Sequence, residues 1–414
     1  MRFRAFLAVC LLAGSCRALS AQELKITPAR VLFDEVVAIR ASGLRPNERV
    51  TIQATLVDGA GGRWSSQAEF KADEQGIVDV SRQAPEKGSY NELSAMGLIW
   101  SMKPTDKNVD RYSPPRDLGN QIIELELLEG GKSVAKAQLE QREVADGVRQ
   151  IKVQGELHGV LFVPAADGSH PGVLVVGRGG APLETAAWLA SHGFAAFALA
   201  YFGYEGLPQD LEAIPLEYFG RALAWMRQRP EIATDRIAVL GASRGGELAL
   251  QLGSMYPHIR AVVAYVPANV RFGGNGTRFP YAWTWQGHPL AYVFPARLNS
   301  PTAAMLAAIP VEQTHGPILL ISGKDDATWP SPTMADAIVT RLKSAHFEYA
   351  VEHLCYSHAG HLAGRPEIVP AWHREMSRPF PGGTPKGDAE SSLDAIPKVL
   401  EFLRTSLEAA APAK

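Results

Sequence analysis

The apolar positions of the chain change their spacing near residue 150. Before that point they fall in short runs of strand length, such as 36–39, 50–54 and 122–127, separated by turn-forming segments. Short strands at this spacing predict a small antiparallel β-sandwich. We expect this all-β domain to occupy residues 22–150.

After residue 150, short apolar runs alternate with longer amphipathic segments. One of these segments, 216–227, places Phe219, Leu223 and Met226 at helical spacing. The alternation predicts a mostly parallel, doubly wound sheet covered on both faces, over residues 151–414. Such sheets hold their catalytic groups at the carboxyl ends of the strands. The expected strands include 172–176, 194–200, 237–240, 261–265 and 318–321.

The segment from about 270 to 310 interrupts this alternation. It places five aromatic residues between glycines and prolines: Tyr281, Trp283, Trp285, Tyr292 and Phe294. Two interpretations are equally open. The segment is either an excursion that covers the active site, or an ordinary surface loop that buries its aromatic side chains.

The first 21 residues have the three parts of a secretory signal peptide. A basic start precedes an apolar stretch from Ala5 to Leu12, and small residues follow up to Ala21. The apolar stretch is too short to cross a bilayer as a helix. We expect residues 1–21 to be removed and the protein to be exported to the periplasm. The alternatives are a lipid anchor at Cys16, which lacks the usual leucine three residues earlier, and a cytosolic protein.

The composition narrows the classes of partner. The 414 residues are 46% hydrophobic and 20% charged, which is enough apolar material for a sizeable core. The net charge of −2 gives no reason to expect a nucleic acid. We expect a small-molecule substrate, no cofactor, no metal and no stable membrane span; the sequence carries no signal for an oligomeric state. Because Cys10 and Cys16 lie in the segment expected to be removed, Cys355 is the thiol that remains in the exported chain. We expect it to be a small buried side chain.

A candidate nucleophile lies between a strand and a helix. Gly241-Ala242-Ser243-Arg244-Gly245 follows the strand that ends at Leu240 and precedes a helical segment. This G-x-S-x-G pattern in this setting predicts a sharp turn that raises the Ser243 hydroxyl above the sheet edge. The amides that begin the helix would face a developing oxyanion. The alternative is a glycine-rich turn without chemistry.

The acid and the base are expected later in the chain, in that order. Asp325 and Asp326 follow the strand 318–321, and we assign the acid to Asp326 with Asp325 as the alternative. His361 lies in the loop after the next strand and is the expected base, with His358 as the alternative. A serine needs such a base, and the base needs a carboxylate to fix its tautomer.

Two further assignments concern this region. For the oxyanion we expect the backbone amide of Arg244, paired with that of Gly179 or Gly180 in the loop after the strand 172–176. The alternative for that loop is a plain glycine-rich turn.

His353 lies inside a strand and is expected to be structural. A metal site made of His353, His358 and His361 near Cys355 is a weaker alternative, because these positions give no regular ligand face.

With these residues in place, the chain resembles the family of acyl-CoA thioesterases and bile acid-CoA:amino acid N-acyltransferases. The resemblance implies an immunoglobulin-like N-terminal sandwich joined to a C-terminal α/β-hydrolase domain. It also implies that Ser243, Asp326 and His361 form the catalytic triad. The matching stretches are 95–100, 200–208, 216–219, 241–248, 309–312, Asp325-Asp326 with Trp329, and 359–361.

The resemblance implies hydrolysis of a carboxylic ester or thioester through an acyl-enzyme. By this resemblance, transferase members of the family are expected to have cysteine at the nucleophile position. The serine at this position here favours hydrolysis over transfer to an amino acid. Vertebrate thioesterases of the family act on coenzyme A thioesters inside cells, which an exported protein would rarely meet. Two rivals remain open: acyl transfer to an amine or alcohol, and a periplasmic binding protein that keeps the fold without turnover.

Overall fold

The computed structural model describes residues 21–177, 179–297, 300–373 and 381–408. The predicted signal peptide and Cys16 therefore lie outside the described residues, apart from Ala21. No helix in the described ranges is long and apolar enough to span a bilayer.

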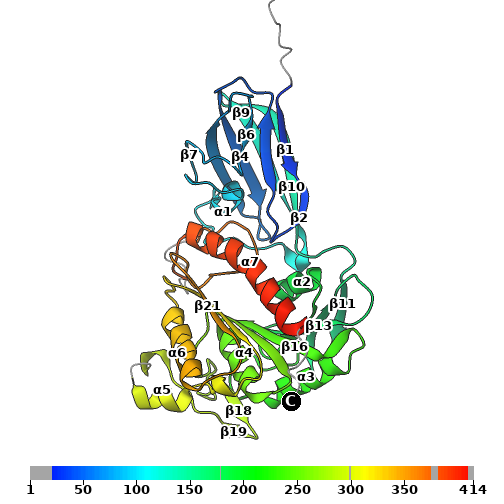
Figure 1. Cartoon of the computed structure of the whole chain (residues 1–414), viewed down its shortest axis with the longest axis vertical. Helices are drawn as coiled ribbons and strands as arrows, with labels where there is room; N and C mark the ends of the chain where they lie inside the picture. Colours follow the sequence, from blue (N-terminus) through cyan, green and yellow to red (C-terminus); the bar gives the residue numbers. More distant parts are fainter. Residues whose placement is uncertain (1–20, 178, 298–299, 374–380, 409–414) are drawn as a thin grey trace, which may run out of the picture.

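The N-terminal part consists of two β-sheets that enclose one core (Figure 1). The alternation predicted from the sequence is visible in β4, where Val50, Ile52, Ala54 and Leu56 are buried and their neighbours point outward. The smaller sheet has the order β1-β3-β6, and the larger one β2-β10-β9-β4-β5-β7 with β8 added to β5. These elements are β1 Glu23–Thr27, β2 Arg30–Leu32, β3 Ala38–Ser42, β4 Arg49–Val57, β5 Arg63–Lys71, β6 Val78–Asp79, β7 Lys87–Gly88, α1 Gly97–Trp100, β8 Lys103–Pro104, η1 Arg116–Leu118, β9 Asn120–Glu129 and β10 Lys132–Arg142.

The C-terminal part is built on an eight-stranded sheet with the order β11-β12-β14-β13-β16-β17-β20-β21. β12 runs antiparallel to both neighbours, and from β14 to β21 all pairs are parallel. The fold prediction, an α/β hydrolase preceded by a β-sandwich, is thus confirmed. The strands are β11 Arg149–Val153, β12 His158–Val163, β13 His170–Val176, β14 Ala195–Ala200, β16 Ile232–Ala242, β17 Ile259–Tyr265, β20 Ile318–Gly323 and β21 Val351–Tyr356.

Helices cover both faces of this sheet, which explains why its central strands β13, β14, β17 and β20 are apolar almost throughout. Val262 and Val263, adjacent in β17, belong to different hydrophobic cores on opposite faces. Helices α2 Leu183–Ser191 and α7 Pro385–Glu408 pack on the face that shares its core with the sandwich. Helices α3 Glu217–Arg227, α4 Arg244–Met255 and α6 Ser331–Ser344 pack on the other face.

The two parts are held together by hydrogen bonds as well as by this shared core. Backbone amides of the segment 361–373 reach the sandwich, from Ile368 to the Phe33 oxygen at 2.8 Å and from Ala371 to the Trp100 oxygen at 3.0 Å. The Trp188 indole of α2 donates to Asp34 at 3.0 Å. In Figure 1, α7 lies between the sandwich and the sheet. The sandwich therefore bounds the C-terminal domain on the side where α7 and α2 lie.

The interrupting segment forms small elements, and of its five named aromatic side chains it fully buries Trp283. β18 Trp283–Trp285 pairs with β19 His288–Pro289 and with β15 Ile214–Pro215, and η2 Pro295–Arg297 and α5 Pro301–Ala307 follow. Trp283 is 1% exposed and donates its indole N–H to Glu247 of α4 at 2.7 Å. Phe294, by contrast, is 42% exposed.

Candidate active site

The predicted elbow has the strained geometry that its sequence pattern implies. Ser243 has φ 59° and ψ −119° between β16 and α4. A Cβ atom at Gly241 would overlap the Gly245 carbonyl, and one at Gly245 would overlap the Val176 carbonyl. The glycines are therefore required where strand and helix pass each other, and the serine hydroxyl projects from the corner.

The structure brings Ser243, His361 and Asp326 together in one hydrogen-bonded chain. His361 Nε2 lies 2.9 Å from Ser243 Oγ, and Nδ1 lies 2.9 and 3.0 Å from the two Asp326 oxygens. Since a carboxylate accepts hydrogen bonds, Nδ1 carries the proton and neutral Nε2 accepts from the serine hydroxyl. The Asp326 side chain is fully buried and that of His361 is 13% exposed. This arrangement suits proton transfer from serine to imidazole.

Asp326 is fixed by donors other than the histidine. It accepts bonds from the Thr328 amide at 2.9 Å and the Ser331 hydroxyl at 2.6 Å. The Trp329 ring stands edge-on to His361 with centroids 5.1 Å apart. The acid and its histidine are therefore held from several sides.

The loops that carry the acid and the base are tied to a third segment. The His361 amide donates to the Pro381 oxygen at 2.7 Å, and the Asp325 amide donates to the Ala359 oxygen at 3.0 Å. The Gly360 amide donates at 2.8 Å to Asp388 of α7, a carboxyl that is 4% exposed. Burial raises the pKa of Asp388 to about 7.

The alternative acid and base lie at the surface. Asp325 and His358 have side chains 50% and 77% exposed, and they face each other at 3.6 Å. Neither takes part in the bonds to Ser243. The free Cys355 lies in β21 and is half-buried rather than fully buried.

His353 belongs to a second serine–histidine–aspartate array. Its Nε2 lies 2.7 Å from Ser322 Oγ and its Nδ1 lies 3.0 Å from Asp336. Ser322 is fully buried, so no substrate reaches its hydroxyl. The three candidate metal histidines thus have separate partners, and the described residues contain no group of three or more ligands arranged for a metal.

The oxyanion donors fall at the same strand edge. Arg244 begins α4, directly after the nucleophile. The Gly180 amide donates to the Phe202 oxygen at 2.9 Å, so it is already engaged. Gly179, with φ 130°, lies so close to the Phe202 ring that a Cβ would contact it at 2.9 Å. Arg244 and Gly179 therefore stay the predicted pair, and the structure does not favour Gly180.

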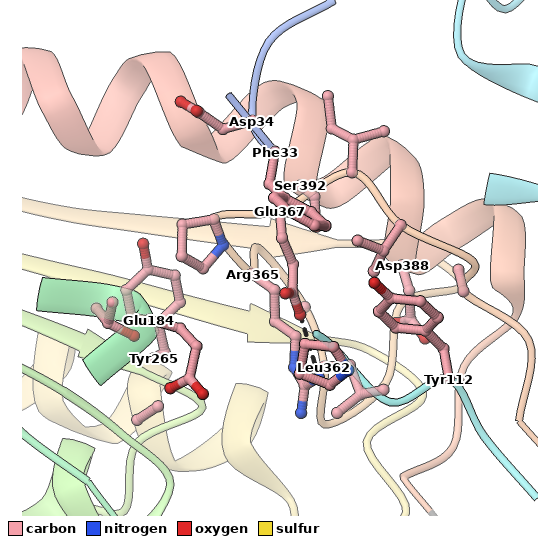
Figure 2. A pocket seen from close by; sticks show the side chains of 18 of the residues that line it. Phe33, Asp34, Tyr112, Glu184, Tyr265, Leu362, Arg365, Glu367, Asp388 and Ser392 are labelled. Atoms are coloured by element: carbon pink, nitrogen blue, oxygen red, sulfur yellow. Dashed lines mark hydrogen bonds and ion pairs between the residues drawn. The ribbon is translucent and has the colours of Figure 1, made fainter. Parts of the chain in front are cut away.

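A cavity of about 670 Å³ opens onto Ser243 and His361 between the two domains. Figure 2 shows Tyr112 of the sandwich at the right of the view and Glu184 and Tyr265 of the hydrolase domain at the left, with Phe33 of the sandwich at the top between them. No described residue from 270 to 310 lines it. Of the two interpretations of that segment, the structure supports the surface loop that buries aromatics. The contribution of the sandwich to the cavity wall could not be predicted from the sequence, because its lining residues are scattered along the chain.

Sequence reasoning also missed Glu247, one helical turn after the nucleophile. It is fully buried, and its carboxylate lies 2.7 Å from Arg244 Nη1. Burial raises the pKa of Glu247, and the positive charge of Arg244 opposes that rise. An acidic residue four positions after the serine was the available signal. Glu247 ties the start of α4 to Trp283.

Comparisons with known proteins cover nearly the whole chain. Acyl-coenzyme A thioesterase 1 of Mus musculus is 34% identical over 405 residues, or 91% of this chain and 95% of that protein. The mitochondrial acyl-coenzyme A thioesterase 2 of Homo sapiens is 32% identical over 420 residues, 94% of this chain and 85% of that one. Among solved structures, a truncated carbohydrate esterase from gut microbiota has a TM-score of 0.44 at 12% identity, covering 64% of this chain and 99% of its own.

Both halves of the chain also match family descriptions. Residues 34–155 match the "Acyl-CoA thioester hydrolase/BAAT N-terminal region". Residues 214–278 and 290–409 match "BAAT / Acyl-CoA thioester hydrolase C terminal". The chain therefore belongs to the acyl-CoA thioester hydrolase/BAAT family.

Proposed function

We propose that the protein hydrolyses carboxylic thioesters, and the corresponding esters, through an acyl-enzyme on Ser243. The observation that carries this proposal is the hydrogen-bonded chain from Ser243 through His361 to Asp326, which opens into the interdomain cavity. The relatives named acyl-coenzyme A thioesterases support coenzyme A as the thiol.

The first half of the reaction uses His361 as a base and then as an acid. Nε2 takes the proton of Ser243 while Oγ attacks the carbonyl carbon, and the carbonyl oxygen becomes an oxyanion. The amides of Arg244 and Gly179 would donate to that oxygen. When the carbon–sulfur bond breaks, the proton on Nε2 passes to the departing thiolate.

The second half regenerates the serine. A water molecule gives its proton to His361 Nε2 and attacks the ester carbon of the acyl-enzyme. The tetrahedral intermediate collapses, the carboxylic acid leaves, and Nε2 returns the proton to Ser243. Asp326 orients the ring throughout and stabilises the imidazolium. A serine ester reacts with amines less readily than a thioester on cysteine would, which favours water as the acceptor.

The test is a hydrolysis assay on coenzyme A thioesters of varied acyl length and on 4-nitrophenyl esters. Ser243→Ala should lower kcat about 10⁴-fold or more. Ser322→Ala is the matched control, since it removes the buried serine of the second array; it should keep most of the activity. Activity that survives Ser243→Ala, or an amide product in place of the acid when amines are added, would contradict the proposal.

We also propose that the protein is exported after removal of residues 1–21. The basic, apolar and small-residue parts of that segment support the proposal. The mass and N-terminal sequence of the protein purified from the periplasm test it. Export predicts a mature chain that begins near Gln22, and an intact Met1 in the cytosol would contradict it.

A further inference from the structure

Three carboxylic side chains face the interdomain cavity from different parts of the chain. Glu143 follows β10 of the sandwich, Glu184 lies in the first turn of α2, and Glu367 lies in the segment 361–373. They are close enough that Glu367 and Glu184 both act electrostatically on Glu143. The carboxyl groups therefore form one cluster on the wall of the cavity that serves Ser243.

Polar atoms in this cavity lack partners although they are buried. Glu143 is 7% exposed, and within the described residues its Oε1 has no hydrogen-bond partner. The same holds for the Tyr265 hydroxyl, on a side chain that is 5% exposed and lines the same cavity. An unpaired buried polar group costs free energy, so both atoms point to a ligand that would satisfy them.

Among the described residues, the neighbouring charges do not neutralise the cluster. Arg365 approaches Glu367 at 3.5 Å, the pair joined by the dashed line in Figure 2, but the Arg365 side chain is 54% exposed. Asp34 pairs with His192 at 2.8 Å. The described part of the cavity lining holds more carboxylic side chains than guanidinium groups. These side chains are Asp34, Glu143, Glu184, Glu367 and Asp388, with Arg111 and Arg365.

We propose that the acyl group of the substrate carries a cationic nitrogen, which lies among Glu143, Glu184 and Glu367. The proposal rests on the hydrolase function above and names its substrate class. A plain hydrocarbon chain would leave Glu143 Oε1 and the Tyr265 hydroxyl without partners. A metal cation is a poorer occupant, because no described group of three or more side chains is arranged to coordinate one.

The cluster gives this specificity a pH dependence. Burial raises the pKa of Glu143 to about 8, and the charges of Glu367 and then Glu184 add to the rise. Tyr112 also faces these carboxyl groups, and burial raises its pKa. In the free protein at pH 7 Glu143 is therefore protonated. A bound cation stabilises the ionised carboxylate, so its binding at pH 7 must release that proton. Affinity for a cationic acyl group should rise between pH 7 and 9.

Two 4-nitrophenyl esters of equal shape test the proposal. One has an acyl chain that ends in dimethylammonium, whose N–H can donate a hydrogen bond, and the other ends in isopropyl. We expect the wild type to prefer the cationic ester by at least about tenfold in kcat/KM, and the preference to grow from pH 7 to 9. Because His361 serves both esters, its contribution cancels in the ratio.

Substitutions then locate the preference. Glu143→Gln and Glu367→Gln should each lower the ratio about tenfold. Glu156→Gln, on an exposed loop, is the matched control and should leave the ratio unchanged. A wild-type ratio of one or less, or a ratio that neither substitution in the cavity alters, would overturn the proposal.

A binding measurement separates this proposal from the proposed function. Calorimetry on Ser243→Ala, which cannot form an acyl-enzyme, should show the amide with a dimethylammonium-ended acyl chain binding at least about tenfold more tightly than its isopropyl analogue. If neither ester is cleaved but this preference is present, the hydrolase function fails and the cationic site stands. If both esters are cleaved equally and both amides bind equally, the cationic site fails alone.

Discussion

The carboxyl group of Asp388 accepts a hydrogen bond from the Gly360 amide, 2.8 Å away, at the residue that directly precedes His361. Asp388 lies in α7, on the helix that packs beside the sandwich, so this bond links the histidine loop to the interdomain wall. The relationship makes Asp388 a positioning residue.

Replacement of Asp388 should therefore act on the rate of the chemical step. Asp388→Ala removes the acceptor, and we expect kcat to fall about tenfold while KM changes little. Asp388→Asn keeps an oxygen at that place and should restore most of kcat. Steady-state kinetics on one ester measures both. An equal loss of kcat in the two variants would show that the hydrogen bond from the Gly360 amide does not determine the rate.

Substitutions of the two histidines of the loop, His358 and His361, should differ sharply in their effect on activity. His361→Ala removes the group bonded to Ser243 and should lower kcat by about 10⁴-fold or more. His358→Ala changes an exposed side chain that faces Asp325 across 3.6 Å, and should keep most of the activity. The reverse ranking in the same assay would show that the base is assigned wrongly.

Glu247 should matter mainly for stability. Glu247→Gln leaves the Arg244 guanidinium, 12% exposed, without its charged partner. Breaking a buried ion pair in this way costs about 3–5 kcal/mol. Urea unfolding checks this value, with Glu312→Gln as the control, because its pair with Arg341 is partly exposed and worth about 1 kcal/mol or less. Equal effects in both variants would contradict the role given to Glu247.

The raised pKa of Glu143 predicts how stability depends on pH. In the unfolded chain this carboxyl ionises near 4.5, whereas in the folded protein it keeps its proton up to about 8. Between these values the unfolded state binds fewer protons, so wild-type stability falls as the pH rises. Glu143→Gln removes that loss and should be more stable by about 3–5 kcal/mol at pH 9, with little difference at pH 4. Unfolding curves at both pH values measure it, and a variant less stable at pH 9 would refute the prediction.

The fold and the nucleophile could be predicted because their signals are local. The change of apolar spacing near residue 150 reflects a real change of sheet, from β10 to β11. Ser243 is marked by a strand, a glycine-flanked turn and a helix within a short stretch, and each glycine proves to be sterically necessary.

The remaining site features depend on contacts between distant residues. Asp325 and Asp326 are adjacent in sequence, and only the bonds from Ser331 and His361 show which one turns inward. The cavity wall joins Tyr112 and Glu143 to Glu367, far apart in the chain, so no periodic pattern announces it. The buried position of Trp283 became clear only from its hydrogen bond to Glu247, a residue distant in the sequence.

Labelling with a fluorophosphonate, followed by peptide mass mapping, tests whether the Ser243 hydroxyl is the activated nucleophile. We expect one adduct, on the peptide that contains Ser243, retained in Ser322→Ala and abolished in Ser243→Ala. A folded wild type that stays unlabelled, or an adduct on a different residue, would show that Ser243 is not the nucleophile.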